Sequence, residues 1–129
     1  MNLFFLMTGQ DGQGEPFLRD ASSLVTRDAV EVFRSLPSFA ERLRRPKDPF
    51  SVVVVLGPSD EDLKKVAPLR EYLKESRILL VLRDQSEETI SLAHRVLPTY
   101  ITYLDNGTSG VVSVIRRVMK DNSVREGEK

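Results

Sequence analysis

The stretch FSVVVVLGPSDED, residues 50–62, joins an unbroken apolar run to the start of a helix. Its four consecutive valines do not alternate with polar residues, and such a continuous apolar run is typical of a strand covered on both faces in the middle of a parallel sheet. Ser59, followed three residues later by Asp62, matches the capping-box pattern of a helix N-terminus. A buried strand that passes directly into a helix is half of a βαβ unit, so this stretch favours an α/β fold.

The same alternation extends over the rest of the chain. Apolar runs predict strands at 2–7, 29–34, 50–56, 77–82 and 100–104, and amphipathic segments predict helices at 15–28, 35–46, 59–76, 86–98 and 108–121. The fourth run is as continuous as the valine run, whereas VEVFRS alternates and suits an edge strand. Five strands alternating with five helices predict three layers, α/β/α, around a doubly wound, five-stranded parallel sheet.

Proline and the apolar spacing make further predictions within these helices. Pro68 lies inside the third predicted helix and predicts a kink or a restart there. The fourth predicted helix has Ser86 as its expected cap, and Pro98 is expected beyond its end. Its expected inward-facing positions are Ile90, Ala93 and Leu97.

Composition limits the classes of function. The chain has 129 residues, and Lys+Arg and Asp+Glu both number 19. A protein that binds nucleic acid usually carries a basic excess, so no nucleic-acid partner is expected. Cysteine is absent and His94 is the single histidine, which excludes a disulfide framework, a thiolate metal site and a histidine cluster. We expect one domain over residues 1–121 and, because the last residues carry almost no apolar surface, a flexible tail at 122–129.

No segment predicts a membrane location. The longest purely apolar run, residues 52–56, is far shorter than the roughly 20 residues that span a bilayer. The N-terminus meets glycines and an acid at once, instead of the basic flank and small-residue cleavage site of a signal peptide. We therefore expect a soluble cytoplasmic domain without a membrane partner.

A glycine-rich loop, MTGQDGQGEP at residues 7–16, follows the first predicted strand, where many α/β proteins bind phosphate. It lacks the lysine and hydroxyl of a Walker A loop, and its order G-x-x-G-x-G differs from the dinucleotide fingerprint G-x-G-x-x-G. Its place suits a flavin phosphate loop, but Thr8 is its one hydroxyl, and Asp11 and Glu15 would repel a phosphate. A flavin or nucleotide ligand and a flexible connection without a ligand both remain open. The candidate ligand-binding residues are Thr8, Gly9, Gly12 and Gly14.

The order and spacing of these segments resemble a receiver domain of bacterial two-component response regulators. VEVFRSLPSFAERLRRPKDPFSVVVVLGP, residues 30–58, resembles that family's second strand, short second helix and third strand. LREYLKESRILLVLRDQSEETISLAHRVLPTYITYLDNG, residues 69–107, resembles its third helix through its fifth strand. The resemblance implies a flavodoxin-like fold with strand order 2-1-3-4-5 and a role in two-component signalling.

The chemistry of that family is phosphoryl transfer to an aspartate at the end of the third strand. Acids after the first strand hold magnesium, a Ser or Thr ends the fourth strand, and a Lys ends the fifth. At the end of the third predicted strand, this chain carries Leu56, Gly57 and Pro58 in place of the aspartate. After the first strand it carries Thr8, Gly9 and Gln10, with Asp11 as the one acid. The fourth strand ends in Leu82 and Arg83 without a hydroxyl, and the fifth ends in Leu104, Asp105 and Asn106 without a lysine. The nearest acid to the third strand, Asp60, is expected in the first turn of a helix. The chain is therefore expected to be a degenerate, non-phosphorylated receiver with no catalytic residue, metal site or cofactor, and not an enzyme.

An interaction surface is the remaining candidate for function. Tyr100 and Tyr103 lie three residues apart on the last predicted strand, so they point to opposite sides of the sheet. Exposed tyrosines are common at protein contacts, although core packing suits either residue as well. Arg116 and Arg117 on the last predicted helix are docking charges or cations that suit a helix C-terminus. Receivers pair through their fourth helix, fifth strand and fifth helix, so the resemblance implies a protein partner or a homodimer on this face.

Overall fold

The computed structural model describes residues 2–9, 12–46 and 50–127. Within these ranges, parallel strands form one five-stranded sheet in the order β2-β1-β3-β4-β5. The strands are β1 (Leu3–Leu6), β2 (Val30–Phe33), β3 (Val52–Leu56), β4 (Arg77–Leu82) and β5 (Tyr100–Tyr103). The predicted strands and the predicted strand order are confirmed, and the fold is flavodoxin-like.

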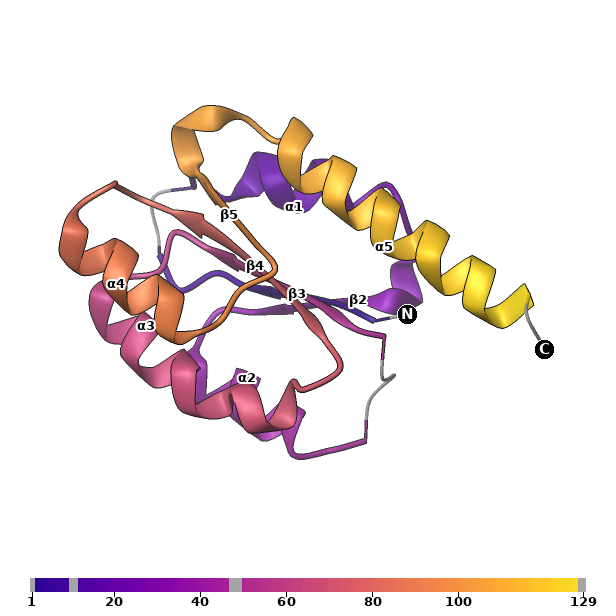
Figure 1. The fold of residues 1–129 in the computed structure, drawn as a ribbon, viewed down its shortest axis with the longest axis horizontal. Helices are drawn as coiled ribbons and strands as arrows, with labels where there is room; N and C mark the ends of the chain where they lie inside the picture. The colour runs from indigo at the N-terminus through magenta and orange to yellow at the C-terminus, as the bar shows by residue number, and fades with distance from the viewer. Residues whose placement is uncertain (1, 10–11, 47–49, 128–129) are drawn as a thin grey trace.

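Helices cover both faces of the sheet (Figure 1). The α-helices are α1 (Glu15–Ser22), α2 (Leu36–Leu43), α3 (Asp60–Val66), α4 (Glu87–Arg95) and α5 (Ser109–Gly127), and short 3₁₀ segments are η1 (Arg27–Ala29), η2 (Ala67–Tyr72) and η3 (Leu104–Asn106). In Figure 1, α1 and α5 lie on one face of the sheet, and α2, α3 and α4 lie on the other. This arrangement confirms the predicted three layers. Among the described helices, none combines the length and the apolar character that crossing a membrane requires.

The sheet divides the core into two apolar layers, because neighbouring strand residues point to opposite faces. Phe4 and Leu6 of β1 pack with α2, α3 and α4, whereas Leu3 and Phe5 pack with α1 and α5. All residues of β3 are buried, so the valine run is covered on both faces, as its lack of alternation predicts. The β2 strand lies at one edge of the sheet and is only partly buried, in agreement with its alternating sequence.

Serine side chains cap the helices as predicted. The Ser59 side chain accepts a hydrogen bond from the Asp62 N–H, and the Asp62 carboxylate accepts one from the Ser59 N–H, each at 3.1 Å. Ser86 accepts a hydrogen bond from the Thr89 N–H at 3.2 Å at the start of α4. The prediction for Pro68 is also confirmed, because α3 ends before this residue and the chain restarts as η2.

The end of α4 differs from the prediction. The helix ends at Arg95, and Leu97 adopts a left-handed conformation with φ +53°. Ala93 is buried as predicted, but Val96 takes the next buried position and Leu97 is 62% exposed. The inward-facing prediction for Leu97 is therefore wrong. Pro98 cannot continue the helix, so the helical period no longer applies at Leu97.

The last helix, α5, packs against the sheet and is tied to α1. Val111, Ile115 and Val118 are buried, as their spacing predicts. Thr108, just before α5, donates its hydroxyl hydrogen to Oδ2 of Asp20 at 2.6 Å. The backbone of α5 is helical to Gly127, so the helix continues into the segment that was predicted as a tail. The flexibility of that segment stays a prediction.

Protonation of Asp20 is expected to weaken the link between α1 and α5. The hydrogen bond from Thr108 is the main cause that holds the pKa of Asp20 below its ordinary value; burial opposes it, and Arg19 adds to it. A carboxyl group with a lowered folded-state pKa stabilises the fold above its ordinary pKa, and this contribution is lost as the pH falls through the folded-state pKa. Thr108→Val should therefore lower the free energy of unfolding in urea more at about pH 7 than at about pH 2. An equal loss at both pH values would contradict this role of Asp20.

Candidate functional site

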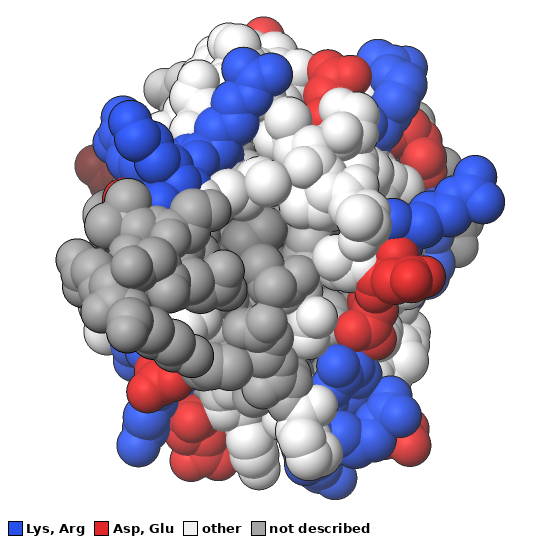
Figure 2. All heavy atoms as spheres, turned by 90° about the vertical axis from the view of Figure 1, so that its right-hand side faces the viewer, with Lys and Arg blue, Asp and Glu red and all other residues white. Residues whose placement is uncertain are grey.

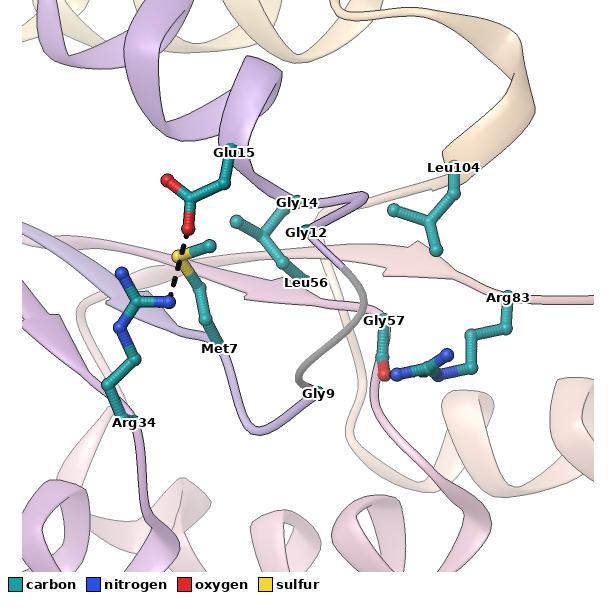
Figure 3. A pocket seen from close by; sticks show the side chains of 10 residues that line it. All are labelled: Met7, Gly9, Gly12, Gly14, Glu15, Arg34, Leu56, Gly57, Arg83 and Leu104. Atoms are coloured by element: carbon teal, nitrogen blue, oxygen red, sulfur yellow. Dashed lines mark hydrogen bonds and ion pairs between the residues drawn. The ribbon is translucent and has the colours of Figure 1, made fainter.

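The carboxyl ends of the strands meet at one edge of the sheet, where a small cavity opens (Figure 3). In an open parallel sheet, ligands bind at this edge, beside the point where neighbouring strands send their connections to opposite faces. That point lies between β1 and β3 here. The cavity has a volume of about 110 Å³. It is lined by Met7, Gly9, Gly12, Gly14, Glu15, Arg34, Leu56, Gly57, Arg83 and Leu104.

Thr8, which was predicted with the glycines, is used by the fold instead of lining this cavity. Its hydroxyl donates to Oδ2 of Asp62 at 2.5 Å, and the same oxygen accepts the Ser59 N–H of the capping box. This contact ties the loop after β1 to the start of α3. The hydroxyl of the predicted ligand-binding set therefore already has a structural partner.

Gly14 lies where α1 starts close to β3. A Cβ added to Gly14 would lie 3.1 Å from Cβ of Leu56 and 3.2 Å from Cε of Met7, which is tighter than ordinary van der Waals contact. The glycine therefore lets the start of α1 pack against the end of β3, and this packing accounts for Gly14 without a ligand. Gly12 faces open space, since no heavy atom lies within 4 Å of an added Cβ.

Arg83, the residue after β4, lies across the end of β3. Its Nε donates a hydrogen bond to the Gly57 carbonyl oxygen at 2.6 Å. Figure 3 shows its guanidinium beside Gly57, on the opposite side of the cavity from Arg34. Gly57 itself has φ +59°, a left-handed conformation that favours glycine. A cation and a backbone carbonyl thus meet at the end of β3, a contact that sequence analysis missed.

An ion pair closes the other side of the cavity. Nη1 of Arg34 lies 3.2 Å from Oε1 of Glu15, and both side chains are more than half exposed. Such an exposed pair contributes little to stability. It does set the charge of the lining, because Glu15 neutralises one of the two guanidinium groups. A phosphate at this loop would have to compete with the Glu15 carboxylate.

Two acids at this edge of the sheet, Asp60 and Asp84, accept hydrogen bonds from residues at the start of α4. Oδ1 of Asp60, in the first turn of α3 as predicted, accepts the Thr89 hydroxyl at 2.8 Å. Asp84 accepts the Ser86 N–H at 3.0 Å, and this backbone hydrogen bond is the main reason that the pKa of Asp84 lies below its ordinary value. Within residues 2–9, 12–46 and 50–127, no group of three or more His, Cys, Asp or Glu side chains is placed to hold a metal ion. Asp11, the acid predicted to remain in the loop after β1, lies outside the described residues.

The predicted interaction residues lie on or near β5, the outermost strand of the sheet on the side opposite β2. Tyr100 packs against the apolar layer under α1 and α5, and Tyr103 against the layer under α2, α3 and α4, so they point to opposite faces as predicted. Both side chains are partly buried. The Tyr100 hydroxyl lies against Gly110 of α5, where an added Cβ would clash with it. Arg116 and Arg117 are exposed on α5.

Positive and negative side chains are interleaved on the molecular surface that Figure 2 shows, the right-hand side of Figure 1. Lys and Arg lie next to Asp and Glu around its rim, with uncharged residues between them. Outside the grey atoms, this face therefore carries no single continuous basic field. Such interleaving suits a protein contact better than a phosphodiester backbone.

A second hollow, of about 390 Å³, lies at the amino end of β5 and is open to solvent. Its lining consists of His94, Leu97, Pro98, Thr99, Tyr100 and Ile101. His94 is exposed near the C-terminus of α4, as expected of a histidine on a helix surface. The hollow could not be predicted from the sequence, because the helical period places Leu97 in the core. The signal that marks the turn is Pro98, which directly follows this leucine.

Comparisons with known proteins bear on the fold. Neither a protein-family model nor a curated protein matches the chain. A solved structure from Burkholderia pseudomallei, described as a pilus assembly-related protein, is 13% identical with a TM-score of 0.63, over 92% of this chain and 88% of that chain. A response regulator from the same organism, solved with a phosphorylated aspartic acid, calcium and citrate, is 16% identical with a TM-score of 0.60, over 97% of this chain and 75% of that chain. At these identities, the likeness shows a shared flavodoxin-like fold.

Proposed function

We propose that this chain is a receiver-like domain of bacterial, cytoplasmic signalling that has lost phosphoryl transfer and acts as a protein-interaction module. It is not an enzyme in this proposal. Its partner, another protein or a second copy of the chain, binds through α4, β5 and α5. The fold is shared with a response regulator whose structure holds a phosphorylated aspartic acid, and this supports the receiver part of the proposal.

The observation that carries the proposal is the contact of Arg83 with Gly57. Receiver chemistry needs a carboxylate at the end of the third strand and further carboxylates that gather a metal ion beside it. Here the end of β3 offers a left-handed glycine whose carbonyl oxygen is 2.6 Å from the guanidinium of Arg83. Asp60, the nearest acid along the chain, accepts a hydrogen bond from the Thr89 hydroxyl. This arrangement supports the loss of the phosphoryl acceptor.

The interaction part of the proposal rests on the face around β5. This strand ends the sheet, so its outer side has no neighbouring strand among the described residues. Tyr100 and Tyr103 are partly exposed there, and Arg116 and Arg117 are exposed on the adjoining helix. Aromatic and arginine side chains are enriched in protein interfaces. Sedimentation over a range of concentrations distinguishes a homodimer from a monomer whose partner is a different protein.

Titration of the protein with Mg²⁺ and then with beryllofluoride, a phosphoryl mimic, is expected to produce no saturable change. The reason is that no cluster of three or more metal-binding side chains is found among the described residues, and that the end of β3 carries Leu56, Gly57 and Pro58 where receiver chemistry needs a carboxylate. Backbone amide NMR shifts of the residues after β1 and β3 provide the measurement, with an intact receiver domain as the positive control. Saturable shifts near Asp60 or Asp11 would contradict the proposed loss of phosphoryl chemistry.

The alternative, a flavin or nucleotide held by the glycine-rich loop, stays a prediction. The cavity at this loop exists and has an arginine on each side. Its volume of about 110 Å³ is below the roughly 300–1,000 Å³ of small-molecule sites, and a flavin ring needs more room. Thr8 and Gly14 also have structural uses there. A visible absorption spectrum of the purified protein checks for flavin, and an ultraviolet spectrum checks for a nucleotide.

A further inference from the structure

We propose that the hollow around Leu97, at the turn from α4 to β5, docks an acidic segment of a partner protein that places an apolar side chain against Leu97. This inference rests on the proposed function, since it names the chemistry of the partner on the face around β5. The interaction residues predicted from the sequence do not include Leu97.

The backbone at Leu97 is unfavourable for the residue it carries. Its φ of +53° lies in the left-handed region, where glycine or asparagine is the usual residue after a helix. The next residue is Pro98, and a residue before proline disfavours helical conformations and favours extended ones. A side chain in such a conformation persists only where its surroundings or its use require it. Leu97 is 62% exposed, so burial of its side chain does not offset the cost.

The turn is anchored on both sides of Leu97. The Leu97 N–H donates to the His94 carbonyl oxygen at 3.1 Å, and the Thr99 N–H donates to the Ile78 carbonyl oxygen of β4 at 2.8 Å. These bonds hold the leucine outward beside a hollow of about 390 Å³. Tyr100 and Ile101 in the same lining are partly buried and offer apolar surface. An exposed apolar side chain held beside a hollow offers a place where an apolar side chain of a partner can be buried, and that burial favours binding.

The charges around this turn are mainly positive. His94 and Arg95 form the last turn of α4, and both are exposed. Arg77 begins the neighbouring strand β4, is exposed, and by the pairing of Leu79 with Tyr100 lies across from Pro98. The two arginines, Arg77 and Arg95, favour a negatively charged partner.

Among the described residues, neither Arg77 nor Arg95 forms an ion pair that would compensate its charge. Glu87 and Glu88 lie in the first turn of α4, and a helix from Glu87 to Arg95 rises about 12 Å. Glu75, before β4, follows Lys74 directly, so the pair adds no net charge. A protein segment with acidic and apolar side chains complements both the positive charge around this turn and the exposed side chain of Leu97. A nucleic acid supplies negative charge but no aliphatic side chain to contact the leucine.

The experiment is a titration followed by backbone amide NMR and fluorescence anisotropy. The probe is a short peptide of glutamate and aspartate interrupted by leucines. One control peptide carries serines in place of the leucines, and the other keeps the leucines but carries lysines. We expect shifts centred on residues 94–101 and an affinity for the probe about tenfold or more above that for either control.

The decisive variant is Leu97→Gly. Glycine suits the left-handed conformation, so the melting temperature should rise while the affinity for the acidic leucine peptide falls about tenfold or more. A residue that serves only the fold would not change the two quantities in opposite directions. Val32→Ser, which alters an exposed apolar residue at the opposite edge of the sheet, is the matched control and should leave peptide binding unchanged.

Several outcomes would overturn the proposal. These are the absence of saturable binding, equal binding of the serine or lysine peptide, unchanged binding by Leu97→Gly, and preferential binding of a single-stranded RNA probe at the same residues. Self-association of the free protein that Leu97→Gly abolishes would assign the hollow to a second copy instead. Binding of Mg²⁺ and beryllofluoride would contradict the lost phosphoryl chemistry without changing this titration, so the two failures are distinguishable.

Discussion

Phe39→Ala is expected to lower the free energy of unfolding by about 3–5 kcal/mol. Phe39 of α2 is fully buried, and its ring lies 5.5 Å from the ring of Phe33 in β2. Phe33 in turn lies 6.0 Å from Phe4 in β1, so the substitution opens a cavity beneath α2 in a chain of aromatic contacts. Urea unfolding, followed by circular dichroism, measures the change.

The companion variant for this prediction is Phe39→Leu. Leucine keeps most of the apolar volume, so its cost is expected to be about 1–2 kcal/mol. If alanine and leucine cost the same, the loss would not arise from the cavity. A loss below about 1 kcal/mol for alanine would show that α2 does not pack on the sheet through Phe39.

Arg42→Ala is expected to cost about 2–3 kcal/mol, more than an ordinary ion pair. The Arg42 side chain is 12% exposed and Glu31 is 35% exposed. Nε and Nη2 of Arg42 donate to the two carboxylate oxygens of Glu31 at 2.9 and 3.2 Å. The guanidinium carbon also lies 5.2 Å from the ring centroid of Phe4, an additional cation–π contact. The variant removes these contacts and leaves Glu31 partly buried without them.

Lys64→Ala is the matched control for Arg42→Ala. Lys64 pairs with Glu61 at 3.4 Å on one turn of α3, and both side chains are well exposed. Its loss should cost less than about 0.5 kcal/mol. Arg42→Lys keeps the charge but loses the paired geometry, so it should fall between the two. Equal effects of Arg42→Ala and Lys64→Ala would contradict the role of the partly buried pair.

These two predictions concern the edge of the sheet away from the proposed interaction face. Both β2 and α2 lie at the edge opposite β5. Unfolding measurements at that edge therefore test the fold, whereas the peptide titration at Leu97 tests the interaction. Because the two sites are separate, a variant of Phe39 or Arg42 can lower the free energy of unfolding without lowering the affinity for the peptide at Leu97.

The local elements of the fold could be predicted from the sequence because their causes lie within a few residues. The valine run lacks alternation, and all residues of β3 are buried. Ser59 and Asp62 are three residues apart, and their reciprocal hydrogen bonds form within one helical turn. Pro68 interrupts α3 because its ring and its missing N–H act on the adjoining turn.

The prediction that Leu97 faces inward failed because it depended on where α4 ends. The apolar period indicates which face of a helix is buried, but it does not say at which residue the helix ends. Here α4 ends at Arg95, and Val96 takes the inward position. An extension of the period by two residues beyond Arg95 was enough to place an exposed leucine in the core.

The three-layer α/β fold, its strands and its helix caps follow from sequence pattern alone, and the resemblance to receivers implied that the functional groups of that family are absent from the matching positions. The contacts that residues at those positions make became visible in the folded chain. Thr8 reaches Asp62 across 54 positions of the chain, and Arg83 reaches Gly57 across 26. Such contacts depend on how the strand crossovers bring the carboxyl ends of β1, β3 and β4 to one edge. Periodicity and capping act over single turns, so they cannot pair residues that are distant along the chain.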